Sequence, residues 1–444
     1  MATDKKHDHD FSAHFCINSE CSLFETPEKG NIRFRGHSKS GRIHQIECCQ
    51  CRKSFSEFHG TPFFDAKLPV DEILSIIEHL LEGCGVRQTS RLTKHHTDTV
   101  MRILRVVALH ATVVLNHLLV DIGAREIQMD EFWTFVFKKE KNATVREKLH
   151  DGYGDRWVHL AADAVSRLIV AWKVDRRTKK ATRALVQDVG RRIADPNDAM
   201  YTADQHGPYL PAVKELLEGA TGKDSVPCPT DERPRTLPVE EARTEQPAAS
   251  PKVGDSQPTP PSESTASHAS EAESEPRPAS STNSETTPAR VVKTQASQRP
   301  SAVFATVDKT FKQGEVNKIE RRVQIGSWED VEVRLEQSPV STTINTSFIE
   351  RLNGTFRHLV ERVSRKTLGF SKDPDMLESH MVLMVASYNF VRPHGGLPDQ
   401  QSGKKCTKGH PKTTPAMAAG LTQRPWTLWD LLSFKVPTQN LCGA

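Results

Sequence analysis

Four cysteines near the N-terminus have the spacing of a metal site. Cys16 and Cys21 form a CxxxxC pair, and Cys48 and Cys51 form a CxxC pair. Two such knuckles can bring four thiolates into the tetrahedral arrangement that Zn²⁺ prefers. We therefore predict a zinc ribbon, with Cys49 as an alternative ligand and buried reduced thiols as the competing interpretation. Further alternative ligands are His14, His44 and His59.

Three acidic residues that are far apart in the sequence form a second candidate site. Asp130 interrupts the apolar segment IQMDEFWTF, Asp204 follows AMYTA, and Glu350 opens FIERLNGTFRHLVERV. Two-metal phosphoryl transfer needs carboxylates that hold divalent ions about 4 Å apart, and hard oxygen ligands favour Mg²⁺. An Asp at a strand end is also typical of a turn or a cap. Spacing alone does not exclude Asp163 or Glu131 as the relevant acids.

A basic residue accompanies the last of these acids. Arg357 follows Glu350 by seven residues, which is two turns of a helix, so both side chains can point at one phosphate. The same pattern is compatible with a solvated helix face. The predicted buried stripe of this helix is Leu352, Phe356, Leu359 and Val363.

Apolar periodicity around the acids predicts an α/β unit. The order β-β-β-α-β-α is predicted for a strand at 126–138, a hairpin at 157–174, a helix at 178–193, a strand at 199–203 and a helix at 211–217. Farther along the chain we expect a strand at 318–325, helices at 346–367 and 374–390, and a mostly irregular tail.

A polar helix pair precedes this unit. A short helix is predicted at 88–93, a turn at 94–96, and a long helix with Thr97 as its N-cap. This is the layout of a helix-turn-helix, and an ordinary helical hairpin with a basic face is the alternative. The side chains expected to face DNA are Arg87, Arg91, Lys94, Thr97, Thr99 and Arg102.

Composition separates folded from unfolded segments. Hydrophobic residues make up 36% of the 444 residues, and the mean hydropathy is −0.53. Residues 221–300 hold 13 of the 27 prolines and no Phe, Trp, Tyr or Ile, so they cannot bury enough apolar surface to fold. Outside this segment the chain is slightly basic, which modestly favours a polyanionic partner.

No feature of the sequence predicts a membrane protein. The longest uncharged helical run, at 106–120, is too short and too polar to cross a bilayer. The start, MATDKKHDHD, lacks the apolar segment of a signal peptide. We therefore expect reduced cysteines and a cytoplasmic, nucleoid-associated protein.

Together these motifs resemble the transposases of bacterial insertion sequences, in particular the insertion sequence one family. The resemblance rests on CQCRKSFS, the helix pair, MDEFW, YTADQHGPYL, FIERLNGTFRHLVERVSRKT, SYNFVRPHGGL and the tail TPAMAAGLTQRPWTLWDLL. It implies an α/β catalytic domain with a ribonuclease-H-like mixed sheet flanked by helices, preceded by a zinc ribbon and a helical DNA-binding domain. It further implies that Asp130, Asp204 and Glu350 are a DDE triad holding two Mg²⁺ or Mn²⁺ ions, and that Arg357 is the accompanying basic residue.

The motifs, the composition and the resemblance together predict a domain organisation, in which the insertion inside the catalytic domain is a departure from the family pattern. The expected parts are a zinc ribbon with a disordered N-terminus at 1–65, a helix-turn-helix at 66–122, a catalytic domain at 123–220 and 301–395, a disordered insertion within it at 221–300, and a tail at 396–444. Basic residues expected to hold phosphates near the acids are Arg351, Arg357, Arg362, Arg365 and Lys366.

The implied activity is DNA transposition. Such a protein would bind terminal inverted repeats as a homo-oligomer, cleave the element ends and join them to target DNA. Two alternatives remain open from the sequence: a DNA-binding regulator without catalysis, and a structure-selective nuclease of the same fold.

Overall fold

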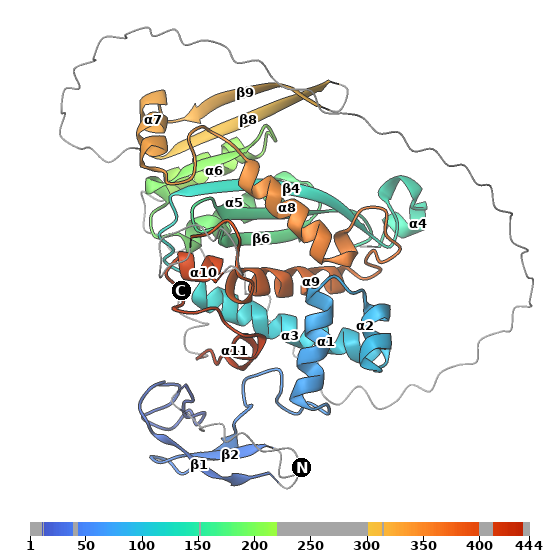
Figure 1. The fold of residues 1–444 in the computed structure, drawn as a ribbon, viewed down its shortest axis with the longest axis vertical. Coiled ribbons are helices and arrows are strands. Elements are labelled where there is room, and N and C mark those ends of the chain that lie inside the picture. The colour runs from blue at the N-terminus through green and yellow to red at the C-terminus, as the bar shows by residue number, and fades with distance from the viewer. Residues whose placement is uncertain are drawn as a thin grey trace, which may run out of the picture. The chain divides into compact units, whose positions relative to one another are not determined.

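The structure is a computed structural model, and it describes residues 11, 13–38, 43–150, 152–219, 301–312, 315–398 and 412–437 (Figure 1). The insertion predicted at 221–300 lies outside the described residues, and so does most of the tail segment before residue 412. Cys228, Cys406 and Cys442 also lie outside them.

The N-terminal part is a three-stranded antiparallel sheet in the order β1-β2-β3, made of β1 (Ile32–His37), β2 (His44–Cys48) and β3 (Ser54–Ser56). Ile46 on β2 pairs with Phe55 on β3, and both side chains are buried. They form a small core together with three of the N-terminal cysteines and Ile32. A core of this size stabilises a fold only weakly, so the cysteines matter for its stability.

Three helices follow: α1 (Val70–Leu81), α2 (Val86–Thr93) and α3 (Thr97–Leu118). Apolar residues at helical spacing are buried along α1 and α3, as the sequence pattern predicts. The predicted N-cap is wrong by one residue. His96 occupies that position with extended dihedrals, and its Nδ1 accepts the backbone N–H of Asp98 at 3.3 Å.

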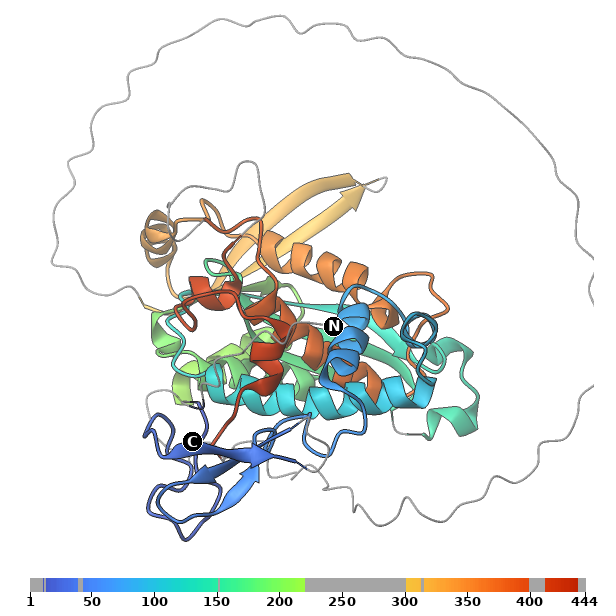
Figure 2. The same ribbon diagram turned by 60° about the horizontal axis from the view of Figure 1, so that its bottom comes forward.

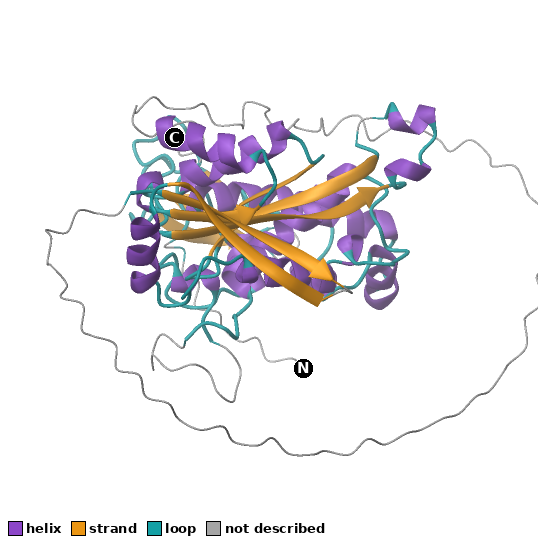
Figure 3. Cartoon of the chain, turned by 90° about the horizontal axis from the view of Figure 1, so that it is seen from above, coloured by secondary structure: helices purple, strands orange, loops and turns teal. Residues whose placement is uncertain are grey.

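The central element is a mixed six-stranded sheet in the order β6-β5-β4-β7-β8-β9. Its strands are β4 (Glu126–Val136), β5 (Gly154–Asp163), β6 (Ile169–Asp175), β7 (Met200–Asp204), β8 (Val303–Lys312) and β9 (Glu315–Ile325). The β4–β7 and β7–β8 pairs are parallel, and the other pairs are antiparallel. Helices cover both faces of the sheet (Figure 3).

The helices of this part are α5 (Lys179–Arg192), α6 (Tyr209–Gly219), α7 (Trp328–Gln337), α8 (Ser347–Leu359) and α9 (Pro374–Ala386), with a π-helical turn at Ser387–Val391. Shorter helices are α4 (Val145–Lys148), α10 (Pro415–Ala418) and α11 (Leu428–Ser433). The long helix α3 packs along α9 (Figure 2). Asn389 connects the π-helical turn to β6. Its Oδ1 accepts the backbone N–H of Ile169 and its Nδ2 donates to the Ile169 carbonyl, at 2.9 Å each.

This arrangement confirms the predicted β-β-β-α-β-α order and is consistent with a ribonuclease-H-like α/β domain. Strand β8 was not predicted, although β9 was. The predicted helix at 346–367 ends early, at Leu359, because Val360 is extended and the Ser364 hydroxyl donates to the carbonyl of Arg357 at 2.6 Å. The tail holds α10 and α11, where mostly irregular structure was predicted.

Strands β7 and β8 are neighbours in the sheet although about a hundred residues separate them in the sequence. Met200 pairs with Val303, and Asp204 pairs with Val307. The chain before residue 220 and the chain after residue 300 therefore belong to one sheet. No helix within the described ranges is long and apolar enough to cross a membrane.

Candidate active site and metal centre

The register between β4 and β7 brings Asp130 and Asp204 side by side. Met129 and Ala203 form the last parallel pair of these strands, and the two aspartates are the next residues. Asp204 ends β7 as predicted. Asp130 does not end its strand, because β4 continues to Val136 along β5. It lies instead where its shorter neighbour β7 stops.

Helix α8 carries Glu350 and lies across β4. The Oε1 atom of Gln128 accepts the backbone N–H groups of Phe348 and Ile349 at 3.1 Å each, and this fixes the first turn of the helix to the strand. One turn after Glu350, Asn353 Nδ2 donates to Asp130 Oδ2 at 2.8 Å. The helix thus both positions the glutamate and orients the first aspartate.

An open cavity of about 460 Å³ lies beside Asp204 and Glu350, at the ends of β7 and β8. Its lining includes Arg177, His206, Asp308, Lys309 and Thr346 in addition to the two acids. Glu350 Oε1 accepts the Thr346 hydroxyl at 2.5 Å and forms an ion pair with the Lys309 ammonium. Asp204 accepts the backbone N–H of His206 at 2.9 Å and lies 3.6 Å from the Arg177 guanidinium.

Burial and the charge of neighbouring acids change the ionisation of the two aspartates. Burial, and after it the nearby charge of Asp204, together raise the pKa of Asp130 to about 7. Burial also raises the pKa of Asp204, with a contribution from Glu131. Like charges that are held together in this way are relieved by a cation, so the donor set fits a hard divalent ion such as Mg²⁺.

The three carboxylates are not close enough together to coordinate a single metal ion. Oxygen ligands about 2.1 Å from one Mg²⁺ lie within about 4.2 Å of each other. In the part of the chain that the structure describes, only the cysteine group places three or more metal-ligating atoms within 4.8 Å of one another. Asp130, Asp204 and Glu350 are therefore near neighbours that are farther apart than the ligands of a single ion.

The two competing acids have structural partners. The Glu131 side chain is only 1% exposed, and it accepts the Arg177 guanidinium at 2.6 Å and the Tyr209 hydroxyl at 2.8 Å. Asp163 Oδ2 accepts the backbone N–H and the hydroxyl of Ser166 at 2.7 and 2.6 Å, in the turn between β5 and β6. Glu131 therefore lies behind the cavity, and Asp163 shapes a turn.

Arg357 does not extend toward the acids. Its guanidinium donates to the carbonyls of Trp133 at 2.9 Å and Val363 at 3.2 Å, and it lies 4.8 Å from the centre of the Phe132 ring. Arg362 donates to the Ser371 hydroxyl at 3.1 Å. Of the predicted phosphate-binding residues, the exposed ones are Arg351, near the start of α8, and Arg365 and Lys366, which follow its end.

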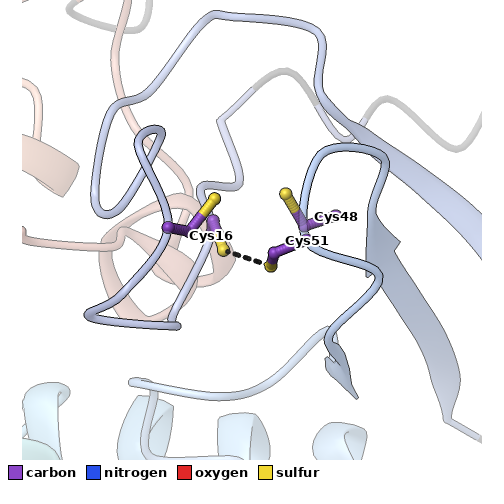
Figure 4. A group of neighbouring side chains, drawn as sticks. Cys16, Cys48 and Cys51 are labelled. Carbon is purple, nitrogen blue, oxygen red and sulfur yellow. Dashed lines mark hydrogen bonds between the residues drawn. The ribbon is translucent and has the colours of Figure 1, made fainter.

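The four cysteines converge at one end of the small N-terminal sheet (Figure 4). All four sulfur atoms lie within 4.8 Å of one another, and the Sγ atoms of Cys16 and Cys51 are 3.5 Å apart. The backbone N–H groups of Asn18 and Leu23 point at the sulfurs of Cys16 and Cys21, at 3.5 Å each. This arrangement could hold a zinc ion.

The electrostatics of the group suit a thiolate-binding metal. The backbone N–H of Lys53 lowers the pKa of Cys51 to about 6. Burial opposes ionisation of Cys48, but the N–H of Cys51 and the Asn31 side chain bring its pKa below the usual range. Burial raises the pKa of the Cys16 thiol. Two of the four sulfurs are thus ready to lose their protons, as zinc ligands must.

The alternative ligands lie outside this group. Cys48 ends β2 with its sulfur inside the cluster, whereas Cys49 is exposed. His44 Nδ1 is 2.9 Å from a carboxylate oxygen of Glu57. The cluster contains neither His14 nor His59.

The helix pair presents the predicted set at its surface. Lys94, in the left-handed conformation with φ 61°, makes the turn between α2 and α3. Arg87, Arg91, Lys94 and Arg102 are exposed, and Thr97 and Thr99 are half-buried. Val100, Leu104 and Val107 are buried as predicted. The basic side chains are therefore accessible to a ligand.

Four side chains of the carboxylate site were not predicted as functional: Arg177, His206, Lys309 and Thr346. Arg177 and His206 lie just after strands, which is the position where the acids were sought, so this rule could have found them. Lys309 lies within a strand that was not predicted at all. Its place could not be read from the sequence.

No family model matches the chain, and no curated protein sequence matches it. Among solved structures, a pre-cleavage Mos1 transpososome matches 35% of this chain and 59% of that chain, with 11% identity and a TM-score of 0.16. The Mos1 Strand Transfer Complex matches 34% and 57%, with 12% identity and a TM-score of 0.15. A Mos1 transposase paired-end complex with the left transposon end matches 34% and 58%, with 12% identity and a TM-score of 0.14. These matches span less than two thirds of those chains, and at such TM-scores they do not define the reaction of this one.

Proposed function

We propose that the protein is a DDE transposase of an insertion sequence. The observation that carries the proposal is the placement of Asp130 and Asp204 at adjoining positions of two parallel strands, with Glu350 on the helix that lies across β4. Burial and neighbouring acids raise the pKa of both aspartates, and Asp204 and Glu350 line an open cavity. Such a group of acids is suited to divalent metal ions and a phosphate substrate.

The proposed reaction has two steps. Water attacks a phosphodiester at the end of the element, a new P–O bond forms, the P–O3′ bond breaks, and a free 3′-hydroxyl remains. That hydroxyl then attacks a phosphodiester of the target DNA, and the target's own 3′-oxygen leaves. Two bound Mg²⁺ or Mn²⁺ ions would supply activation of the attacking oxygen and stabilisation of the leaving one.

The residues of the chain have separate tasks in this scheme. Asp130, Asp204 and Glu350 bind the ions. Asn353 orients the Asp130 carboxylate through its 2.8 Å hydrogen bond. Arg177 links Asp204 to the buried Glu131. Arg357 joins α8 to the backbone of β4.

The N-terminal parts supply recognition in this proposal. The four cysteines bind Zn²⁺ and form a zinc ribbon, and α2 and α3 act as a helix-turn-helix on the terminal inverted repeats. The boundaries are those expected from the sequence, with the catalytic domain at 123–220 and 301–395. The protein would act on element ends and target DNA as a homo-oligomer in the cytoplasm, associated with the nucleoid.

Strand transfer tests the proposal directly. Purified full-length protein is incubated with Mg²⁺, a labelled element end and a target plasmid, and the products are separated by gel electrophoresis. We expect joined products that disappear with EDTA. Cleavage without joining would instead indicate a nuclease of the same fold, and tight end binding without any cleavage would indicate a regulator.

A further inference from the structure

The carboxylate cavity has cations in its wall as well as acids. Arg177 lies on one side beside Asp204, and Lys309 lies on the other side beside Glu350. Phosphoryl transfer places extra negative charge on the reacting phosphate, and a cation that contacts this phosphate stabilises the transition state. The surroundings of the two side chains indicate which one is free to do so.

Arg177 is held in place by other side chains of the protein. Its Nε and Nη2 atoms each lie 2.6 Å from the same oxygen of Glu131, whose side chain is only 1% exposed. The guanidinium also lies 4.8 Å from the centre of the Trp157 ring. Removing Arg177 from Glu131 would leave a buried carboxylate unpaired, and that is costly. Arg177 therefore acts as a fixed support.

Lys309 is held much more loosely. Its ammonium has an ion pair with Glu350, and the two side chains are 24% and 44% exposed. Ion pairs that solvent reaches in this way contribute little to stability. Lys309 lies two residues after Val307, the partner of Asp204 in the sheet, so it projects from the same face of β8 as Val307. A long flexible side chain at this position can exchange one anion for another.

Arg357, the residue that the sequence favoured for this role, is arranged differently. Both of its described hydrogen bonds go to backbone carbonyls, those of Trp133 and Val363. Its side chain is half-buried, and burial lowers its pKa. The cavity lining includes Lys309 and not Arg357.

We propose that Lys309 binds the phosphate of the scissile bond. This inference rests on the proposed function. A Glu350 that ligates an ion shares its charge with that ion, so the Lys309 ammonium requires a second anion. A phosphodiester oxygen in the cavity is that anion.

The test compares full-length Lys309→Met, Lys309→Arg and Arg357→Lys with wild type. The first readout is single-turnover cleavage of a labelled element end in Mg²⁺. We expect Lys309→Met to slow cleavage by about 100-fold or more, as loss of one transition-state donor does, and Lys309→Arg to restore most of the rate because it keeps the charge. Lys312→Met, at the exposed end of the same strand, should stay within a few-fold of wild type.

The second readout is end binding as a function of salt concentration, measured in Ca²⁺ so that an ion can occupy the carboxylates while the equilibrium is read without turnover. Loss of one phosphate contact lowers the slope of log K against log salt by about 1. We expect this change for Lys309→Met and an unchanged slope for Arg357→Lys, which should instead lower the melting temperature.

Failure of the proposed function and failure of this inference alone give different results. A wild-type protein that cleaves no DNA in Mg²⁺ or Mn²⁺ overturns the proposed function and this inference with it. An active wild type with a Lys309→Met variant of equal rate and equal slope overturns this inference alone. Should Lys309→Met fail to fold by circular dichroism, a Lys309→Arg variant as slow as Glu350→Gln would overturn it as well.

Discussion

The cysteine cluster and the carboxylate cavity both bring together side chains from distant parts of the sequence, but their ligand atoms are not equally close to one another. The four sulfurs already lie within 4.8 Å of one another, and backbone N–H groups point at them. The three carboxylates are more widely spaced, and Arg177 and Lys309 contact two of them.

The difference follows from the chemistry of the ligands. Thiols can pack together in the neutral state, so the fold can assemble them before a metal arrives. Carboxylates at neutral pH repel each other and need a compensating cation. The small N-terminal sheet has only a small core beside its cysteine cluster. The six-stranded sheet has a large core of its own and holds its acids at a distance.

The largest effect is expected for Asp204→Asn. The amide keeps the shape of the side chain but loses the charge that binds a cation, so cleavage and joining should fall below detection while DNA binding stays within a few-fold. Gel assays and fluorescence anisotropy measure the two. Asp308→Asn, in the same cavity, is the matched control and should stay active. Normal strand transfer by Asp204→Asn would show that the Asp204 carboxylate is not needed for the reaction and would contradict the proposed metal site.

Loss of one thiolate should remove the metal from the cysteine cluster. We expect the zinc content of Cys51→Ser to fall from about one ion per chain to near zero, since structural sites need four ligands. Cys49→Ser, an exposed neighbour, should keep its zinc. Elemental analysis of purified protein measures both.

The same variant separates the two regions. All six tryptophans lie outside residues 1–65, and Trp429 packs on Phe58 and Phe63, so the fluorescence reports mainly on the rest of the chain. We expect the fluorescence-detected unfolding of Cys51→Ser to resemble that of wild type, while DNA binding is lost. If Cys51→Ser both lost DNA binding and unfolded more readily than wild type by fluorescence, the six-stranded sheet would depend on the cysteine cluster.

A smaller effect is expected for Asn353→Ala. Without its 2.8 Å hydrogen bond, the Asp130 carboxylate is less well oriented, and changes behind metal ligands typically cost about 10- to 100-fold in activity. Single-turnover cleavage measures the loss, which higher Mg²⁺ should partly restore. Thr355→Ala, on the same helix, is the control. Equal rates for the two variants would assign Asn353 to packing alone.

The smallest effect is expected for Arg91→Ala on α2. Loss of one exposed phosphate contact should weaken end binding by about three- to tenfold and lower the salt slope by about 1. Arg105→Ala is the control, because Arg105 lies on α3 and is paired with Asp373 at 2.7 Å. Unchanged binding by Arg91→Ala at low salt would argue against this face of the helix pair.

Much of the sheet could be predicted because its strands bury one face or both. The alternation in IQMDEFWTF and the short run AMYTA marked β4 and β7, and with them the two aspartates. Strand β8 was missed because Val303–Val307 is buried on both faces and so shows no alternation of buried and exposed residues. Lys309 was missed with it.

Side-chain direction was harder to predict than position. Helical spacing correctly placed Glu350 and Arg357 on one helix, but not the direction of the guanidinium. The carbonyls of Trp133 on β4 and of Val363 accept its hydrogen bonds, and Val363 lies in the segment that follows the end of the helix at Leu359. Likewise, Cys48 and Cys49 are adjacent in the sequence, and only the end of β2 decides which sulfur faces inward.

The adjacency of β7 and β8 has a practical consequence for engineering. Gly219, where α6 ends, and Ser301, just before β8, are both exposed. The pairing of Met200 with Val303 joins β7 to β8, so the sheet is continuous across the two parts of the chain. A fluorescent protein or an affinity tag spliced between these two positions would leave every strand of the sheet intact. Separate polypeptides ending at Gly219 and starting at Ser301 would carry complementary parts of the sheet, so that the complete sheet would form only where both are made.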